Sequence, residues 1–461
     1  MTPVKIGLLP LYIALYDDHG STSRQRLEPF YDILAQELES KDVQVVRSPF
    51  CRLSREFQNA VSHFEQAGAD CIVTVHMAYS PSLECTEALS GTNLPVVVLD
   101  TTETEDFGFL QQPAEINYCH GIHGVMDMCN LLRRSGKPYA IAAGHYRQSS
   151  VLDRVIGFAK AAAAARSLAG SKVGSIGGSF PGMGDFQISD SELADRFGVT
   201  VLHADGRELQ ALKDAVTEDE IEAEIIADLA ACSVLQPFPP ESHRRTVRNC
   251  LAVRHWIDRH RLAAFSVNFL EIRPESGLDI MPFMEACKAL ARGIGYAGEG
   301  DLLTAAVTGA LLRSFPDTSF VEIFCPDWKG NALFISHFAE INYRLTSGKP
   351  ELREIVYSYG EAENPIVGSA CYRGGEAIFV NIFRDADRYH LLLAPVTVLE
   401  PEEDTFAGEV RGWLKPSMPV ADFLEAVSRA GVTHHSSLVY DASLEQLAYF
   451  GEILGLSVIK L

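Results

Sequence analysis

The stretch Cys71-Ile-Val-Thr-Val75 decides the fold class of the N-terminal part of the chain. This short apolar run follows a segment with helical spacing, Phe57 to Gln66, and precedes another apolar run, Pro95-Val-Val-Val-Leu99. Strand and helix signals that alternate in this way are typical of a parallel sheet covered by helices on both faces. In such sheets, ligands bind at the carboxyl ends of the strands.

The alternation extends in both directions from this stretch. Further strands are predicted at 4–9, 43–46 and 140–143, and helices at 24–38, 121–134 and 150–168. A second alternating region predicts strands at 172–176, 199–203 and 264–269, and helices at 218–231, 240–260, 281–293 and 299–314. After Phe315 the pattern changes and predicts strands at 321–324, 332–335, 355–358, 377–382 and 390–394, and a helix at 420–430. The last two strands flank a polar turn at 384–388, which is typical of an antiparallel hairpin.

These patterns together predict an α/β protein. Two doubly wound α/β domains, residues 1–170 and 171–316, are followed by a C-terminal antiparallel β-rich, barrel-like domain, residues 317–461. The length of 461 residues is ample for large cores without disulfides or structural metals.

The composition excludes several classes of protein. The chain has 39 basic and 61 acidic side chains, a formal net charge of −22 and no basic run, so we expect no binding to nucleic acid or to an anionic membrane. The ten cysteines include no Cys-x-x-Cys pair, which indicates reduced thiols in a cytoplasmic protein. No apolar stretch reaches about 18 residues, and the N-terminus has no signal-peptide pattern, so no membrane span is expected.

A glycine-rich run, residues 174–184, invites comparison with phosphate-binding loops. It lacks the Lys-Ser/Thr of a P-loop and does not fit GxGxxG, so a tight strand-to-helix loop beside a cleft is the better interpretation. His120 and His123 stand at the start of a helix. There they could bind a metal or an anion, hydrogen-bond a polyol, or simply cap and pack against small glycines.

Two acidic residues also leave alternatives open. Glu299 lies between two glycines at the start of a helix. Its negative charge could simply stabilise the helix N-terminus, or its side chain could contact another group for which the glycines leave room. Glu322 interrupts an apolar strand and points either to solvent or inward, where it would need a partner or a cation. With His337 and His435 these carboxylates would suit a divalent ion, but their spacing cannot show that the four converge.

Several short blocks resemble those of one known family, in the family's order. They are Gly295-Tyr-Ala-Gly-Glu-Gly-Asp301, Ser319-Phe-Val-Glu322, Ser336-His-Phe-Ala-Glu340, His434-His435, Val75-His-Met-Ala-Tyr-Ser-Pro81, His120-Gly-Ile-His-Gly124, Val267-Asn-Phe269 and Asp387-Arg-Tyr-His-Leu-Leu392. On these blocks the chain resembles the L-arabinose isomerase family, within the wider L-fucose/L-arabinose isomerase group, as a divergent member.

The resemblance implies roles for particular residues. Glu299, Glu322, His337 and His435 match the family's ligands of a divalent metal, usually Mn2+, with Co2+ or Mg2+ as alternatives. Residues that match the lining of the sugar pocket are Leu11, Tyr12, His120, His123, Met183 and Phe269. Leu9 and His120 stand where the family has glutamines, which would alter hydrogen bonding to sugar hydroxyls.

The resemblance also implies an activity and an assembly. The activity is that of a metal-dependent aldose–ketose isomerase, which moves protons between C1 and C2 through an enediol with Glu299 and Glu322 as catalytic residues. The assembly is a homotrimer or homohexamer, in which His120 and His123 act on sugar bound by a neighbouring subunit. A non-catalytic sugar-binding or sensory protein on the same fold is the alternative, and the identity of the sugar is left open.

Overall fold

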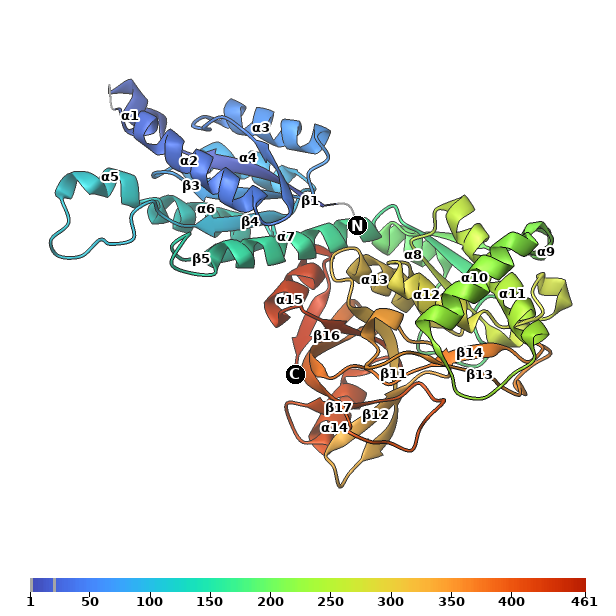
Figure 1. Cartoon of the computed structure of the whole chain (residues 1–461). Coiled ribbons are helices and arrows are strands. Elements are labelled where there is room, and N and C mark those ends of the chain that lie inside the picture. The colour runs from blue at the N-terminus through green and yellow to red at the C-terminus, as the bar shows by residue number, and fades with distance from the viewer. Residues whose placement is uncertain (1–2, 20–21) are drawn as a thin grey trace. The chain divides into compact units, whose positions relative to one another are not determined.

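The computed structural model describes residues 3–19 and 22–461, and the chain divides into two compact units, Met1–Arg166 and Ser167–Leu461 (Figure 1). The domain boundaries expected at residues 170 and 316 stay predictions. No helix within the described ranges is both long and apolar enough to cross a bilayer. All ten cysteines are free thiols, seven of them buried.

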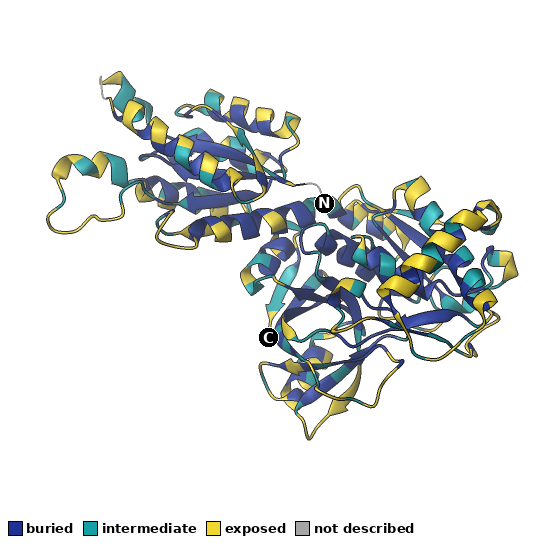
Figure 2. Ribbon diagram, in the orientation of Figure 1, coloured by how far each residue is buried: buried dark blue, intermediate teal, exposed yellow. Residues whose placement is uncertain are grey.

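The first unit is built on a five-stranded, all-parallel sheet in the order β2-β1-β3-β4-β5. These strands are β1 (Val4–Leu11), β2 (Val43–Arg47), β3 (Cys71–His76), β4 (Val96–Asp100) and β5 (Tyr139–Ala143). The helices are α1 (Ala14–Asp18), α2 (Ser23–Glu39), α3 (Ser54–Gln66), α4 (Ser82–Gly91), α5 (Ile116–Cys119), α6 (Ile122–Arg134) and α7 (Val151–Leu168). Every residue of β3 is buried, as expected for a central parallel strand covered on both faces (Figure 2).

The second unit contains a four-stranded parallel sheet in the order β10-β9-β6-β7. Its strands are β6 (Lys172–Ile176), β7 (Thr200–His203), β9 (Ala264–Val267) and β10 (Gly295–Gly298). The helices of this region are α8 (Asp190–Phe197), α9 (Gly206–Ala215), α10 (Glu218–Ala231), α11 (Pro240–His260), α12 (Phe283–Ala291) and α13 (Leu302–Leu312). A Cβ on Gly295 would come within 2.4 Å of the Gly309 nitrogen, so this glycine lets α13 pack directly on β10.

Six antiparallel strands of the second unit close into a barrel, in the order β15-β18-β11-β12-β17-β16 and back to β15. They are β11 (Thr318–Asp327), β12 (Ala332–Ser336), β15 (Gly375–Arg384), β16 (Tyr389–Leu399), β17 (Gly412–Pro416) and β18 (His435–Tyr440). Val321, Leu333, Phe379, Leu392 and Leu438 belong to the core cluster of this region. The predicted fold class, with its C-terminal barrel-like domain, is confirmed.

Smaller elements complete the second unit. Strand β19 (Ser457–Lys460) pairs in parallel with β16, and a three-stranded sheet combines β14 (Ile366–Ser369), β13 (Glu351–Glu354) and β8 (Ser233–Val234). The remaining helices are α14 (Val420–Ala430) and α15 (Leu444–Ile453).

Two predicted strands differ from the structure. Residues 355–358 are not a strand, because the strand lies just before them as β13 and Val356 is 82% exposed in the loop that follows. The strand predicted at 264–269 ends at Val267, because the side chain of Asn268 accepts a hydrogen bond from the Leu270 nitrogen and starts a short 3-10 turn. Both changes bring aromatic side chains toward the cavity described below.

Candidate metal centre

Glu299 is held in an unusual backbone conformation directly after β10. Its φ of +64° lies in the left-handed region, which is costly for a residue with a side chain. Its nitrogen donates to the Val267 carbonyl at 2.9 Å, and its carbonyl accepts from the Phe180 nitrogen at 2.8 Å. A Cβ on Gly298 would lie 2.7 Å from the His337 ring, so glycine is required there for the imidazole to pack against the end of β10.

The barrel supplies the other carboxylate and both imidazoles. Glu322 on β11 is paired with His435 on β18 and with Ser336 on β12, and His337 follows Ser336. Residues opposite each other on antiparallel strands project to the same face, so the register brings Glu322 and His435 together, and His337 follows the end of β12. Ligand atoms of Glu322, His337 and His435 all lie within 4.8 Å of one another, and those of Glu299, His434 and His435 do the same.

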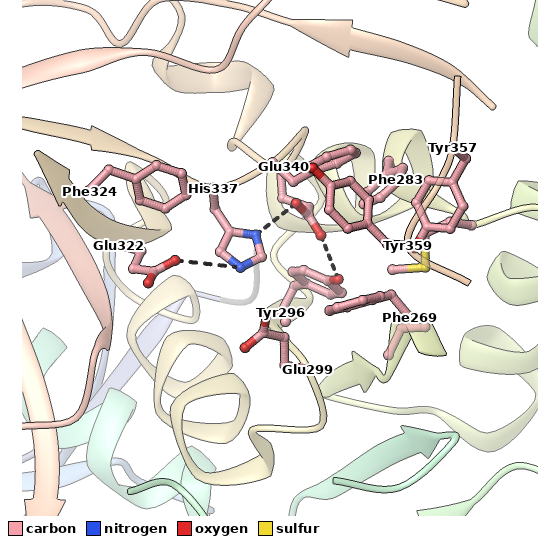
Figure 3. Close-up of a pocket in the computed structure, with 14 residues that line it drawn as sticks. Phe269, Phe283, Tyr296, Glu299, Glu322, Phe324, His337, Glu340, Tyr357 and Tyr359 are labelled. Atoms are coloured by element: carbon pink, nitrogen blue, oxygen red, sulfur yellow. Dashed lines mark hydrogen bonds and ion pairs between the residues drawn. The ribbon is translucent and has the colours of Figure 1, made fainter. Parts of the chain in front are cut away.

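A second layer of carboxylates orients both imidazoles. His337 Nδ1 lies 2.8 Å from Glu340 Oε2, and His435 Nδ1 lies 3.1 Å from Asp301 Oδ2. With Nδ1 of each ring donating to a carboxylate, Nε2 carries the lone pair and faces the acidic side chains. His337 lies between Glu340 and Glu322 in Figure 3, with its Nε2 4.0 Å from Glu322 Oε2.

Two buried polar atoms at the centre lack a hydrogen-bond partner among the described residues. They are His435 Nε2 and Glu299 Oε2, which lie 3.5 Å from each other. Buried polar atoms are rarely left without a hydrogen-bond partner. A set of two carboxylates and two imidazole nitrogens, each imidazole backed by a further carboxylate, is the donor chemistry of a divalent cation such as Mn2+. The residues therefore fit a metal.

The carboxylates of the cluster would be stabilised by a positive charge nearby. Burial raises the pKa of Glu322 above its usual range. Burial would also raise the pKa of Glu299, but His434 and His435 outweigh it and hold this pKa well below its usual range. Burial disfavours a charged His435, yet the carboxylates of Asp301 and Glu299 raise its pKa to about 9. A divalent cation bound here would supply positive charge beside these carboxylates.

A cavity of about 260 Å3 opens beside the cluster (Figure 3). Glu299, Glu322 and His337 line one part of it. Aromatic rings make up much of the remaining lining, namely Phe269, Phe283, Phe338, Tyr357 and Tyr359. A small molecule in this cavity would therefore meet both carboxylates and aromatic rings.

Comparison with known proteins shows which proteins the chain is similar to. Residues 317–457 match the family model of the L-arabinose isomerase C-terminal domain. L-arabinose isomerase of Herpetosiphon aurantiacus is 23% identical, covering 96% of this chain and 91% of the relative. L-arabinose isomerase of Shouchella clausii is 24% identical, covering 98% and 93%, and that of Geobacillus kaustophilus is 24% identical, covering 84% and 80%.

The chain is similar to L-arabinose isomerases over nearly its whole length, and its C-terminal residues match the model of that family's C-terminal domain. The resemblance predicted from the sequence is thus confirmed. Among solved structures, a sugar-binding protein of an ABC transporter from Bacillus halodurans is 11% identical over 79% of this chain and 97% of that chain, with a TM-score of 0.16. A likeness of this size supports no conclusion.

The residues predicted for the site fall into two groups. In the second unit, Glu299, Glu322, His337 and Phe269 line the cavity, and the ring of His435 lies within the same cluster. Met183 is in the loop between β6 and α8, and it is not among the described residues that line the cavity.

The other predicted residues lie in the first unit, at the carboxyl end of its sheet. Leu11 and Tyr12 are fully buried at the end of β1. Tyr16, which the sequence did not single out, links Tyr12 to the histidines: its ring lies 6.0 Å from Tyr12, and its hydroxyl lies 2.8 Å from His120 Nε2. The rings of His120 and His123 are 6.0 Å apart at the start of α6.

Four acidic or basic residues of the cluster were not predicted as site residues. They are Asp185, Asp301, His434 and Glu340. Asp185 Oδ2 lies 2.7 Å from His434 Nδ1, and His434 Nε2 lies 3.6 Å from Glu299 Oε2, so the glycine-rich loop positions a histidine beside the centre. The spacing His337-x-x-Glu340 was the one signal that pointed to such a supporting carboxylate.

Proposed function

We propose that this chain is a metal-dependent aldose–ketose isomerase that acts through an enediol. Two groups of possible ligands that share His435 carry this proposal, Glu322 with His337 and Glu299 with His434. They lie beside a cavity and combine a candidate cation site with two carboxylates able to move protons. Relatives of similar length that are named L-arabinose isomerase support the same class of reaction.

The two carboxylates and the two Nε2 atoms would hold the metal, with Mn2+ as the first choice and Co2+ or Mg2+ as alternatives. A bound divalent cation would supply positive charge next to O1 and O2 of the sugar while negative charge develops there. Asp301 and Glu340 keep the imidazoles in the tautomer and orientation that ligation needs.

Glu299 and Glu322 would carry out the proton transfers. To convert an aldose into a ketose, one carboxylate removes the proton from C2 and returns it to C1, and a proton moves from O2 to O1. We assign the carbon proton to Glu322 and the oxygen proton to Glu299, with the reverse assignment as the alternative. The cavity walls would hold the sugar and reduce its contact with water.

A panel of aldoses and ketoses tests the proposal. The protein with Mn2+ is incubated with each sugar, and the partner sugar is detected by chromatography. We expect conversion of at least one pair in both directions, and none after the metal is removed. Binding of a sugar without any conversion would instead support the non-catalytic sugar-binding protein.

The substitution Asp301→Asn is expected to weaken Mn2+ binding by about 10- to 100-fold. The new side chain keeps an oxygen for the helix cap that Asp301 now provides to the Thr304 nitrogen at 2.9 Å. Its amide NH2 would face His435 Nδ1, which favours the tautomer with the proton on Nε2 and removes the lone pair that a metal needs. Calorimetric titration measures the affinity, and an unchanged affinity would exclude this role.

We also propose that the protein is a homotrimer or homohexamer whose sites combine residues of two subunits. Supporting this, Phe107, Phe109, Leu110 and Met126 of the first unit are exposed apolar side chains, and they flank the segment that carries His120 and His123. Large exposed apolar groups are typical of protein interfaces.

Mixing two inactive variants tests the shared site. Glu299→Gln and His123→Ala change different units, so subunits of the two variants mixed by unfolding and refolding should regain activity well above either parent. The matched control is Glu299→Gln mixed with His337→Ala, where both changes are in the second unit and no recovery is expected. Absence of recovery in the first mixture, with oligomers formed, would argue for sites within single subunits.

A further inference from the structure

The glycine-rich loop, which we define as residues 177–189, holds the start of β18 with two consecutive side chains. Asp185 Oδ2 accepts a hydrogen bond from the His434 nitrogen at 3.0 Å and lies 2.7 Å from His434 Nδ1. The Phe186 ring stacks on the His435 ring, with 5.1 Å between the centroids and 16° between the planes. The loop therefore fixes both the backbone that leads into His435 and the plane of its imidazole.

The same loop supports the backbone of Glu299. The Phe180 nitrogen donates to the Glu299 carbonyl at 2.8 Å, directly beside the left-handed φ of +64°. A Cβ on Gly300 would lie 2.2 Å from the Gly178 carbonyl oxygen, so only glycine lets the two chain segments come this close. A left-handed residue with a side chain persists only where its surroundings constrain it, and the loop supplies part of that constraint.

The loop itself has little internal support. It is fully described by the structure, contains no helix or strand, and buries a single residue, Phe186. Another anchor is Asn268, whose side-chain nitrogen donates to the carbonyls of Gly177 and Ser179, both at 3.3 Å. Segments with few buried contacts and few backbone hydrogen bonds of their own open most easily. The order of this loop therefore depends on its contacts with the metal centre.

A cation bound by Glu299 and His435 would restrain the same residues that the loop contacts. Loop contacts that favour the ligand geometry strengthen cation binding, and a bound cation then favours the ordered loop by the same free energy, because coupling between two binding events is reciprocal.

We propose that Asp185 and Phe186 are positioning residues for the metal ligands, and that cation binding and the ordered glycine-rich loop stabilise each other. Asp185 acts through His434, which leads into β18, and Phe186 acts on the ring of His435. The inference rests on the metal site of the proposed function, but it is independent of the sugar and of the reaction.

Hydrogen exchange measured by mass spectrometry on the full-length protein tests the coupling. Peptides that cover residues 177–189 are compared with and without saturating Mn2+, after calorimetry has measured Mn2+ binding. We expect bound Mn2+ to slow exchange in the loop by about tenfold. The matched control is residues 400–407, also without helix or strand and outside the candidate ligand groups, where exchange should not change.

The outcomes separate the inference from the metal site. Bound Mn2+ with unchanged exchange in the glycine-rich loop, or with equal slowing in residues 400–407, would overturn the coupling and leave the metal site intact. Absence of Mn2+ binding would overturn both.

Asp185→Ala and Phe186→Leu test the two positioning residues. The Asp185 side chain is 37% exposed, so its loss should leave the fold intact, and leucine keeps an apolar group in the buried place of Phe186 without the stacked ring. We expect each change to lower Mn2+ affinity by about 10- to 100-fold and to reduce the protection of the loop by Mn2+. Gln187→Ala, at an exposed neighbour in the same loop, should change neither.

The visible absorption spectrum of bound Co2+ distinguishes positioning from a general effect on stability, because its bands depend on the geometry of the ligands. At saturating Co2+ we expect altered bands in Asp185→Ala and Phe186→Leu and the wild-type spectrum in Gln187→Ala. Wild-type Mn2+ affinity together with a wild-type Co2+ spectrum in both variants would overturn the positioning roles, even if their melting temperatures fell.

Discussion

Glu322→Gln is expected to lower kcat by roughly 10²- to 10⁴-fold while the protein stays folded. Glutamine keeps the shape of the side chain but cannot accept a proton from carbon. Glu322 is paired in register with His435, and its carboxylate is 4.0 Å from His337 Nε2, so the change removes a charge from the centre without removing a tight hydrogen bond there. Initial rates with the best sugar of the panel measure the effect.

The comparison needs a matched control and a test of folding. Glu425→Gln changes an exposed carboxylate on α14 that pairs with Arg429 and is not part of the cluster, and it should leave kcat unchanged. Circular dichroism and the thermal midpoint report whether each variant folds. If Glu322→Gln turns over sugar at the normal rate, Glu322 is not the group that moves the carbon proton, and the assignment fails.

Removal of divalent metal is expected to abolish turnover and to lower thermal stability. A cation that binds only the folded state stabilises it by about 2.7 kcal/mol when its concentration is a hundredfold above Kd. Dialysis against a chelator should therefore remove both the activity and the metal-dependent rise in melting temperature, and added Mn2+ should restore both. Scanning calorimetry with and without Mn2+ measures the shift.

The histidine at the centre makes this prediction specific. His435 is fully buried, and in His435→Asn the metal-dependent rise in melting temperature should disappear. His203→Asn removes an exposed histidine that pairs with Asp190, and it should keep the full rise. Full activity of the chelated wild-type protein would show that the reaction needs no dissociable cation.

Much of the fold could be predicted, because most strands and helices have recognisable patterns of apolar residues in the sequence. The parallel strands are short apolar runs such as β3, since both faces of such a strand are buried. Strand β18 could not be found in this way, because its buried serines look polar in the sequence. Ser437 is satisfied by Thr308 at 2.8 Å, and Ser436 by Asn381 at 2.9 Å, which are contacts between distant parts of the chain.

The candidate site was predicted as a set of residues but not as a geometry. Spacing along the chain cannot reveal that Glu322 and His435 are opposite each other, because strand pairing creates that register. The contact of Asp301 with His435 could not be predicted, because an aspartate at this position is explained by its role as a helix cap. Tyr357, which lines the cavity, was missed because residues 355–358 were predicted as a strand, whereas they lie in a loop.

A crystal grown with Mn2+ tests the central claim most directly, namely that four side chains hold one divalent cation. Data collected near the manganese absorption edge give an anomalous difference map. The account predicts one strong peak about 2.0–2.3 Å from carboxylate oxygens of Glu299 and Glu322 and from Nε2 of His337 and His435. A manganese peak elsewhere, or none among these four side chains at saturating Mn2+, would contradict it.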